Sequence, residues 1–156
     1  MESLLHFDHE FFRFINQVWS NDLFDYLMPF LREKKNWIPL YFVLAFLLIY
    51  QYKWKKGLLT IVLAITTIGI SDTLSSKIIK PTVARARPCH EHSEINTARL
   101  LVGCGSGYSF TSSHATNHFA IATFLGLVLI PLFRYSFSFF MAWAGSIAYA
   151  QVYVGV

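Results

Sequence analysis

Four apolar segments, separated by short clusters of charged or turn-forming residues, constrain this sequence more than any other feature. They cover residues 38–52, 57–70, about 114–133 and 135–156. Trp37 and Trp54 flank the first segment, where aromatic side chains commonly mark the two interfaces of a membrane. The first segment is short for a membrane span, at 15 residues, but its apolarity and its flanking tryptophans are typical of a helix that crosses a bilayer. The sequence therefore predicts an all-α, polytopic membrane helical bundle with about four spans.

The scarcity of charge supports the same fold class. Hydrophobic residues make up 54% of the chain and charged residues only 14%, against roughly 25% charged residues in ordinary soluble domains. This balance argues against a disordered chain, a solvated coiled coil and a typical soluble enzyme. The net charge of +4 does not indicate nucleic-acid binding, because the basic residues lie in short clusters between apolar segments rather than along a solvated face.

The chain is expected to form a single domain over residues 1–156. Residues 1–36 carry apolar side chains at helical spacing and predict amphipathic, interfacial helices, with a break at residues 20–22. Residues 37–156 form the predicted transmembrane core, with a site loop at about 80–114. The second span is expected to end at Lys80, because Pro81 cannot continue a regular helix.

A basic cluster opens this loop and predicts an anion site. Lys80, Arg85 and Arg87 fall within eight positions, and the planar guanidinium group of arginine suits phosphate oxygens. An interfacial anchor for anionic lipids is the alternative interpretation of such a cluster.

A second cluster closes the loop, immediately before the third span. Glycines and serines lead into Ser112, Ser113 and His114, so free backbone amides and the positive end of a helix dipole are expected there. Ser112 or Ser113 is the expected N-cap, and its hydroxyl group is available to a phosphate oxygen. A bound phosphate would favour the protonated form of His114, which could then donate a proton to a leaving oxygen. A capping or packed histidine is the alternative.

Two further features concern the borders of the loop. Asp72 and Lys80 share a helical stripe with Ser76, so Asp72 is expected either to orient a cation or to be a plain interfacial polar residue. Cys89 and Cys104 are the two cysteines of the chain and lie in one loop. They predict a disulfide in an oxidising compartment, with two free thiols as the alternative.

The orientation of the loop is ambiguous from charge alone. Lys53, Lys55, Lys56 and Arg134 fall on one side of the predicted bundle, and the other nine basic residues fall on the side of the loop. The positive-inside rule would then place the loop in the cytoplasm, whereas the cysteines favour the opposite side.

Three motifs in this order resemble the type 2 phosphatidic acid phosphatase family of membrane lipid-phosphate phosphatases. Lys80 to Arg87-Pro88 matches the first family motif, and Thr111-Ser112-Ser113-His114 keeps the serine and histidine of the second. Residues 150–156 resemble the lead-in to the third motif, which continues to a histidine. The resemblance covers the chain from about residue 20 onward.

The resemblance implies hydrolysis of a lipid phosphate monoester or diphosphate, without a metal or other cofactor. Lys80, Arg87, Ser112 and Ser113 would bind the phosphate, and His114 would be the general acid. A histidine beyond Val156 would attack phosphorus and form a phosphohistidine. The implied partners are membrane lipids and a lipid-phosphate substrate, and the implied location is a bacterial inner membrane with the site on the extracytoplasmic side. The substrate and the oligomeric state stay open.

The sequence departs from the family pattern at three points. Thr111 and Ser113 replace proline and glycine, and Gln151 stands where the family has arginine. The third departure is that the nucleophilic histidine is expected after Val156. The 156 residues alone are therefore expected to bind a phosphate headgroup without turnover.

Two other functions were considered for the same residues. His90-Glu91-His92 together with His114 and His118 could serve a zinc-dependent membrane hydrolase, since the last pair has the spacing of two ligands on one helix face. The nearby cations disfavour that metal. A non-enzymatic lipid-phosphate binder or transporter fragment is the second alternative.

Overall fold

The computed structural model describes residues 2–90 and 98–156, and this part of the chain is helical with no strand. The α-helices are α1 (Glu2–Arg13), α2 (Asp22–Arg32), α3 (Ile38–Thr73), α4 (Lys80–Val83), α5 (Ser113–Val128) and α6 (Ser136–Tyr153). Three short helical turns connect them, at Phe14–Val18, Lys34–Trp37 and Leu74–Ile79. The predicted all-α class is confirmed.

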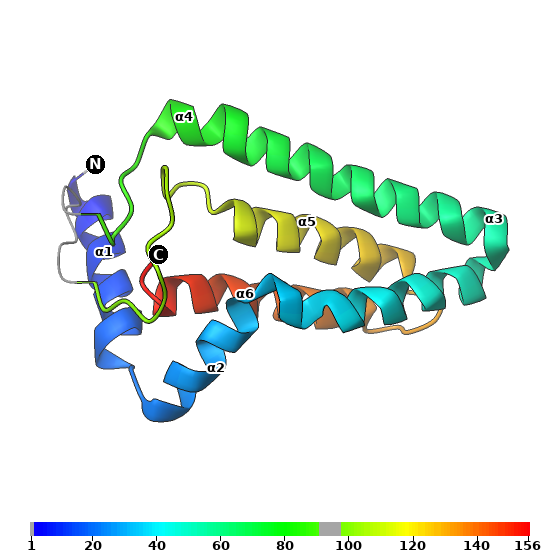
Figure 1. The fold of residues 1–156 in the computed structure, drawn as a ribbon, viewed down its shortest axis with the longest axis horizontal. Helices are drawn as coiled ribbons and strands as arrows, with labels where there is room; N and C mark the ends of the chain where they lie inside the picture. Colours follow the sequence, from blue (N-terminus) through cyan, green and yellow to red (C-terminus); the bar gives the residue numbers. More distant parts are fainter. Residues whose placement is uncertain (1, 91–97) are drawn as a thin grey trace.

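The longest element, α3, is a hairpin of two helical arms (Figure 1). The chain reverses at Lys53, whose backbone has φ 64° and ψ 166° in an otherwise helical segment. The arms approach closely beside the reversal, since a Cβ atom on Gly57 would lie 2.5 Å from the Cα of Ile49. The predicted break between residues 52 and 57 is therefore present, and both arms point back toward the same end of the molecule.

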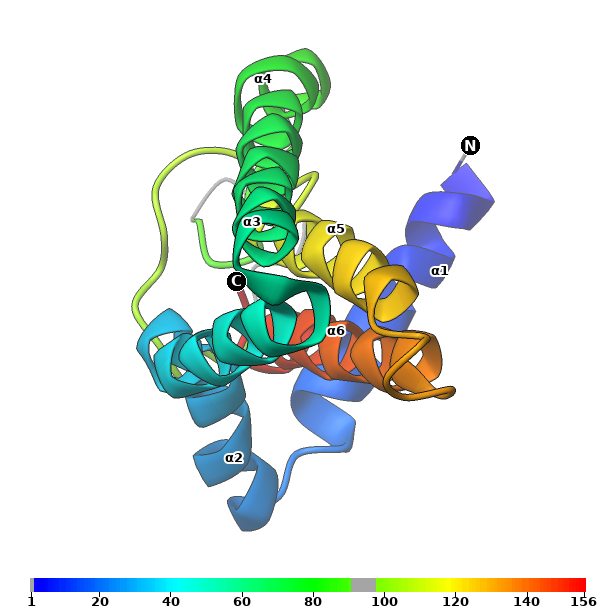
Figure 2. The same cartoon turned by 90° about the vertical axis from the view of Figure 1, so that its right-hand side faces the viewer.

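The core of the bundle lies where α3, α5 and α6 meet, as Figure 2 shows along the bundle. Ala122 of α5 and Ala144 of α6 are fully buried, which brings the two helix backbones close together. Leu48 of α3 and Ile147 of α6 fill the space beside them. A second cluster joins α2 and the turn after α1 to the last turn of α6, through Ile15, Met28 and Tyr153. The N-terminal helices thus pack on the end of the bundle rather than along its side.

One helical run of the described chain, Lys34–Val83, is long and apolar enough to cross a membrane. Only 11% of its most apolar window is buried within the protein, whereas a core helix of a soluble protein would be mostly buried. Phe42, Phe46 and Ile65 are among its exposed side chains. The reversal at Lys53 divides this run into two arms, and the total of about four spans stays a prediction.

The prediction that a helix ends at Lys80 is wrong. A π-helical turn at Leu74–Ile79 continues into α4, and the helix ends at Ala84 in the left-handed conformation. Pro81 is tolerated because it occupies the first turn of α4, after the wider π-turn has interrupted the regular hydrogen-bond ladder.

The third apolar segment ends before its predicted boundary, whereas the predicted break near the N-terminus is present. Helix α5 ends at Val128 rather than near residue 133, and a turn containing Pro131 connects it to α6. The break at residues 20–22 is present, and the Asn21 side chain caps α2 by accepting a hydrogen bond from the backbone amide of Phe24. The interfacial role of residues 1–36 stays a prediction.

Candidate active site

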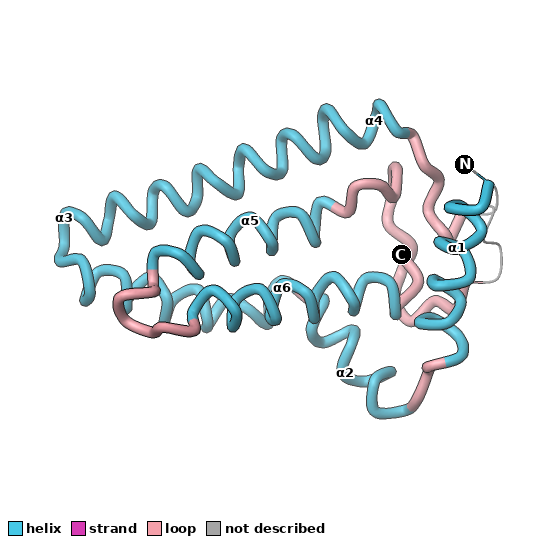
Figure 3. The backbone as a smooth tube through the Cα atoms, turned by 180° about the vertical axis from the view of Figure 1, so that it is seen from behind, coloured by secondary structure: helices cyan, strands magenta, loops and turns pink. Residues whose placement is uncertain are grey.

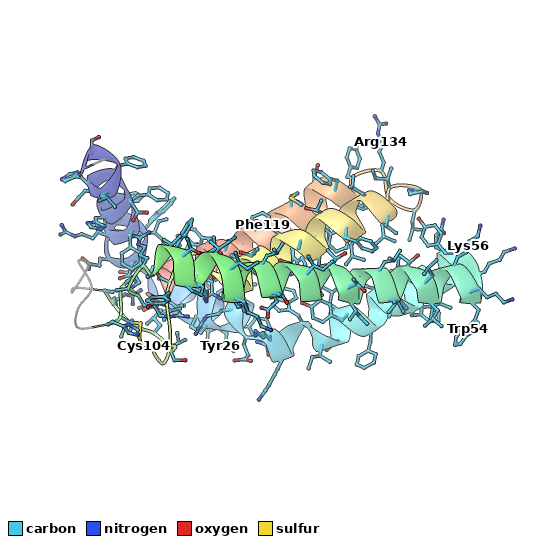
Figure 4. The ribbon with its side chains drawn as sticks, turned by 90° about the horizontal axis from the view of Figure 1, so that it is seen from above. Tyr26, Trp54, Lys56, Cys104, Phe119 and Arg134 are labelled. Atoms are coloured by element: carbon cyan, nitrogen blue, oxygen red, sulfur yellow. A yellow bond between two sulfur atoms is a disulfide. The ribbon has the colours of Figure 1, made fainter. Side chains whose placement is uncertain are left out.

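A cavity of about 410 Å³ opens at one end of the bundle. The loops that follow α4, the start of α5, the end of α6 and the N-terminal helices gather at this end, as Figure 3 shows. Figure 4 places Trp54, Lys56 and Arg134 at the end opposite to Cys104. The residues that line the cavity are Arg32, Lys34, Tyr41, Ile68, Asp72, Lys80, Arg87, Ser109, Ser112, Ser113, His114, Asn117, His118, Ile121, Gln151 and Val156.

The cavity brings together most of the residues singled out in the sequence. Lys80 and Arg87 line it together with the start of α5, although the loop separates them in the chain. Arg32 and Lys34 line it as well, and sequence reasoning did not identify them. Among the described residues that line the cavity, four cations thus accompany one carboxylate, that of Asp72. This excess of positive charge favours an anionic ligand.

The loop that carries Arg87 is held by hydrogen bonds to the segment that precedes α5. Arg87 Nε donates to the carbonyl of Gly107 at 3.1 Å. The backbone amide of Ser109 donates to the Arg85 carbonyl at 2.9 Å, and its hydroxyl donates to the Ala86 carbonyl, also at 2.9 Å. Burial lowers the pKa of Arg87 from its ordinary value, so its charge is partly desolvated and available to a phosphate.

The start of α5 supplies the helix N-terminus predicted for an anion. Ser112 is the N-cap, and its hydroxyl accepts a hydrogen bond from the backbone amide of Ala115 at 3.4 Å. The Ser113 hydroxyl lies 3.0 Å from that of Ser75 and 2.9 Å from that of Ser76. These contacts fix the first turn of α5 against the π-helical turn after α3. Because Ser112, Ser113 and His114 all line the cavity, the positive end of α5 opens onto it.

His114 lines the cavity, and its buried Nε2 has no hydrogen-bond partner in the described part of the chain. His118 packs beside it, with ring centroids 4.6 Å apart, and its Nδ1 lies 2.7 Å from the His114 carbonyl. Nε2 of His114 is thus a buried polar atom without a partner in the described chain, which a ligand in the cavity can satisfy.

Asp72 and Gln151 also lie in the cavity, each with a specific neighbour. Asp72 accepts a hydrogen bond from the side-chain nitrogen of Asn117 in α5, at 2.9 Å. Gln151 is buried in α6, and its Oε1 accepts a hydrogen bond from Arg32 Nε at 3.1 Å. Asn117 and Arg32 could be found only from the structure, because each meets its partner from a distant helix.

Arg85 does not line the cavity. It forms an ion pair with Asp8 of α1, on the far side of the loop. Arg87, two positions later, instead donates to the Gly107 carbonyl and lines the cavity. Arg85 therefore ties the loop to the N-terminal helix.

A disulfide joins Cys89 to Cys104 and closes the loop beside the cavity. His90 lies next to it, and the three side chains are close enough to suggest a metal cluster. The two sulfur atoms are bonded to each other, however, and zinc binds cysteine as the thiolate, so the disulfide does not offer zinc ligands. Glu91 and His92 of the alternative zinc site lie outside the described residues. In the cavity, His114 and His118 could offer ring nitrogens to a metal, but the surrounding cations oppose one.

A buried polar cluster fastens the loop to both the N-terminal helices and α6. The fully buried Asn16 donates to the carbonyls of Arg99 and Tyr153, at 2.9 and 2.8 Å, and accepts from the Arg99 amide. Arg99 donates two hydrogen bonds of 2.7 Å to the carboxylate of Asp25. Gly155 (φ 85°) completes the contact, since a Cβ atom there would lie 2.5 Å from the Arg99 carbonyl oxygen.

This cluster predicts a loss of stability in acid. Hydrogen bonds from Arg99 and then Tyr153 lower the pKa of Asp25 from 3.8 to about 2. A carboxyl group whose pKa is lower in the folded state stabilises the fold above its unfolded pKa and loses that contribution as the pH falls. We expect the melting temperature of the detergent-solubilised protein to fall between about pH 4 and pH 2 for this reason.

The matched control for this prediction is Asp25→Asn, which keeps the size of the side chain and removes the titrating group. Its melting temperature should be lower than that of the wild type at pH 7 and should change less between pH 4 and pH 2. Parallel curves for the two proteins over that interval would contradict the assignment to Asp25.

Comparison with known proteins agrees with a phosphate site on a helical frame. Residues 57–156 match the model of the PAP2 superfamily. The chain therefore belongs to the PAP2 superfamily of phosphatases. The resemblance seen in the sequence motifs is confirmed, and so is the class of enzyme.

Two curated relatives are lipid A 4'-phosphatases. The chain is 31% identical over 160 residues to the one from Bacteroides thetaiotaomicron and 29% identical over 159 residues to the one from Porphyromonas gingivalis. The whole chain aligns in both cases, and it spans 69% and 65% of the lengths of these relatives. They support hydrolysis of a lipid phosphate.

The fold is also similar to a solved structure, that of a transmembrane PAP2-type phosphatidylglycerolphosphate phosphatase from Bacillus subtilis. The TM-score is 0.70 at 17% sequence identity, and the match covers all of this chain and 75% of the other. At this identity the similarity concerns the fold.

Proposed function

We propose that this protein hydrolyses a membrane lipid phosphate, a monoester or a diphosphate, through a phosphohistidine intermediate and without a metal ion. Lys80, Arg87 and the start of α5 bind the phosphate. His114 Nε2 protonates the leaving oxygen, and a histidine following Val156 attacks phosphorus. Water then hydrolyses the phosphohistidine, with neutral His114 accepting its proton.

The observation that carries this proposal is the convergence of Lys80, Arg87 and His114 at one cavity. Phosphoryl transfer requires positioning and the neutralisation of charge on the phosphate oxygens, and cations with helix amides supply both. Val156 lines the same cavity, so a residue that follows it would begin beside the phosphate site. This placement supports a nucleophile at that point of the chain.

A second cavity supports a lipid as the substrate. This apolar groove of about 290 Å³ lies between the two arms of α3 and α5, and it shares Tyr41, Ile68 and Ile121 with the phosphate cavity. A lipid could therefore place its headgroup among the cations while an acyl or prenyl chain follows the groove. Because two relatives act on lipid A, a lipid A phosphate is the first substrate to test, followed by phosphatidic acid, phosphatidylglycerol phosphate and an isoprenyl diphosphate.

The disulfide supports a location for the site. A bond between Cys89 and Cys104, in the loop that carries Arg87, fits an oxidising compartment. We therefore propose that the cavity opens on the extracytoplasmic side of a bacterial inner membrane, with the reversal at Lys53 on the cytoplasmic side. The count of basic residues favours the opposite orientation, but Arg32, Lys80 and Arg87 at the cavity end serve the phosphate site in this proposal and do not report the orientation.

The experiment that tests the mechanism is rapid-quench trapping in alkaline detergent on the full-length protein, with a substrate labelled in its phosphate group. We expect label on the protein in a form that is stable in alkali and labile in acid, as a phosphohistidine is, and undiminished turnover in EDTA. Turnover that disappears in EDTA and returns with zinc would contradict the proposal. Headgroup binding without turnover or trapped label would instead favour a non-enzymatic binder.

A further inference from the structure

The contact between Arg32 and Gln151 joins two parts of the chain at the phosphate cavity. Arg32 is the last residue of α2, and Gln151 lies in the last turn of α6, 119 positions later. Arg32 Nε donates to Gln151 Oε1 at 3.1 Å, and both side chains line the cavity with Arg87 and His114. Arg32 lies outside residues 57–156, the segment that matches the family model.

The geometry leaves the charged end of Arg32 available for a ligand. The bond to Gln151 uses Nε, and no residue of the described chain accepts a hydrogen bond from the two terminal nitrogens of Arg32. A guanidinium group anchored through Nε keeps two parallel N–H groups for a bidentate contact with phosphate. Gln151 Nε2 is itself buried without a partner in the described residues, so the same point of the cavity has an unused donor.

The electrostatic surroundings of Arg32 also call for an anion. Burial and the charge of Arg87 lower its pKa from the ordinary value, with the adjacent Glu33 acting in the opposite direction. Two guanidinium groups close enough to repel each other are stabilised by an anion between them. The side chain that the family motif places at position 151 is arginine, and here that position holds an uncharged glutamine.

We propose that Arg32, positioned by Gln151, binds the substrate phosphate and replaces the arginine that the family motif has at position 151. The cation has moved from α6 to the end of α2, and Gln151 holds it over the same cavity. Arg32 contacts the phosphate, whereas Gln151 is a positioning residue. This inference rests on the proposed phosphatase function and names a residue of its phosphate site.

Four variants of the full-length protein test this proposal: Arg32→Ala, Arg32→Lys, Gln151→Arg, and Arg32→Ala combined with Gln151→Arg. Loss of one phosphate-binding group costs about 10²–10³-fold in rate, so we expect Arg32→Ala to lower kcat/KM by that factor. Arg32→Lys keeps the charge without the fork and should retain an intermediate rate. The double variant supplies a guanidinium group from α6 instead. Its kcat/KM should be at least about tenfold higher than that of Arg32→Ala, which would recover half of a 10²-fold loss on a logarithmic scale.

The double variant separates binding from a structural role. If the contact only tied α2 to α6, removing Arg32 would break it, and arginine at position 151 would restore nothing. Arg134→Ala is the matched control, because Arg134 lies at the opposite end of the molecule (Figure 4). Its kcat/KM should stay within about threefold of the wild type, as expected of a surface change. The melting temperature of each variant identifies any that fail to fold.

Two results would overturn the proposal: Arg32→Ala within threefold of the wild type, or a folded double variant no more active than Arg32→Ala. Binding of inorganic phosphate, measured by calorimetry, gives a readout independent of turnover. Arg32→Ala should weaken it at least about tenfold, the factor expected for one charge-assisted contact, and unchanged binding would count against the proposal. His114→Ala separates a failure of the proposed mechanism from a failure of the proposed role of Arg32. An active His114→Ala enzyme contradicts the mechanism, whereas an active Arg32→Ala enzyme contradicts only the role of Arg32.

Discussion

Replacing His114 by alanine in the full-length protein is expected to lower kcat for a lipid phosphate by about 10²–10⁴-fold, the usual contribution of a general acid. His114 lines the cavity, and its buried Nε2 has no partner in the described chain. Without that proton donor, the alcohol or phosphate would have to leave as an unprotonated oxyanion. Single-turnover kinetics would measure the effect on the chemical step.

The leaving group provides the control for this prediction. A nitrophenyl phosphate releases a stable phenolate and needs little help from an acid, so the loss caused by His114→Ala should be much smaller with that substrate. His114→Asn should behave as alanine does, because an amide does not donate a proton to a leaving group at neutral pH. Equal losses on the lipid and the nitrophenyl substrate would show that His114 acts through binding or folding instead.

Arg87→Ala is expected to have the second largest effect, a decrease in kcat/KM of about 10²–10³-fold. Arg87 is partly buried at the cavity, and its Nε bond to the Gly107 carbonyl leaves the rest of the guanidinium group for phosphate oxygens. Arg87→Lys should recover part of the rate, because it restores the charge without the planar fork. Steady-state kinetics on a lipid phosphate would measure all three proteins.

Arg85→Ala is a close control for Arg87→Ala. The two arginines are separated by one residue and have the same charge, but Arg85 is paired with Asp8 outside the phosphate cavity. We expect Arg85→Ala to stay within about threefold of the wild-type kcat/KM, as surface changes usually do. Similar losses for both arginines would contradict the separation seen in the structure and would indicate that the whole loop binds phosphate.

Much of the candidate site could be predicted from the sequence because its residues fall in local patterns. The spacing from Lys80 to Arg87 and the run Ser112-Ser113-His114 are short motifs, and local chemistry relates each to phosphate. The glycine and serine residues before α5 likewise indicated a helix N-terminus, and Ser112 caps that helix. Such features can be recognised from the sequence because the groups that act together are neighbours in the chain.

The arginines show what the sequence could not decide. Arg85 and Arg87 have the same charge and nearly the same position in the chain, and only the packing of the loop against α1 sends Arg85 to Asp8. Arg32 lies far from every motif in the chain, yet its place at the end of α2 brings it to Gln151. The helix end predicted at Lys80 is also wrong, because a π-turn that contacts Ser113 through Ser75 and Ser76 precedes Pro81, and the helix continues to Val83.

The sequence by itself determined the class of fold and the type of chemistry, since apolar segments, cation spacing and a histidine after a serine pair are properties of neighbouring residues. The tertiary structure decided which cations share one cavity. Buried contacts across large sequence separations, such as those of Asn16 with Arg99 and Tyr153, fold the N-terminal helices onto the end of the bundle. That packing places Arg32 opposite Gln151. Side chains from α2, α6 and the turn after α1 meet only after the apolar faces of these helices have been buried together.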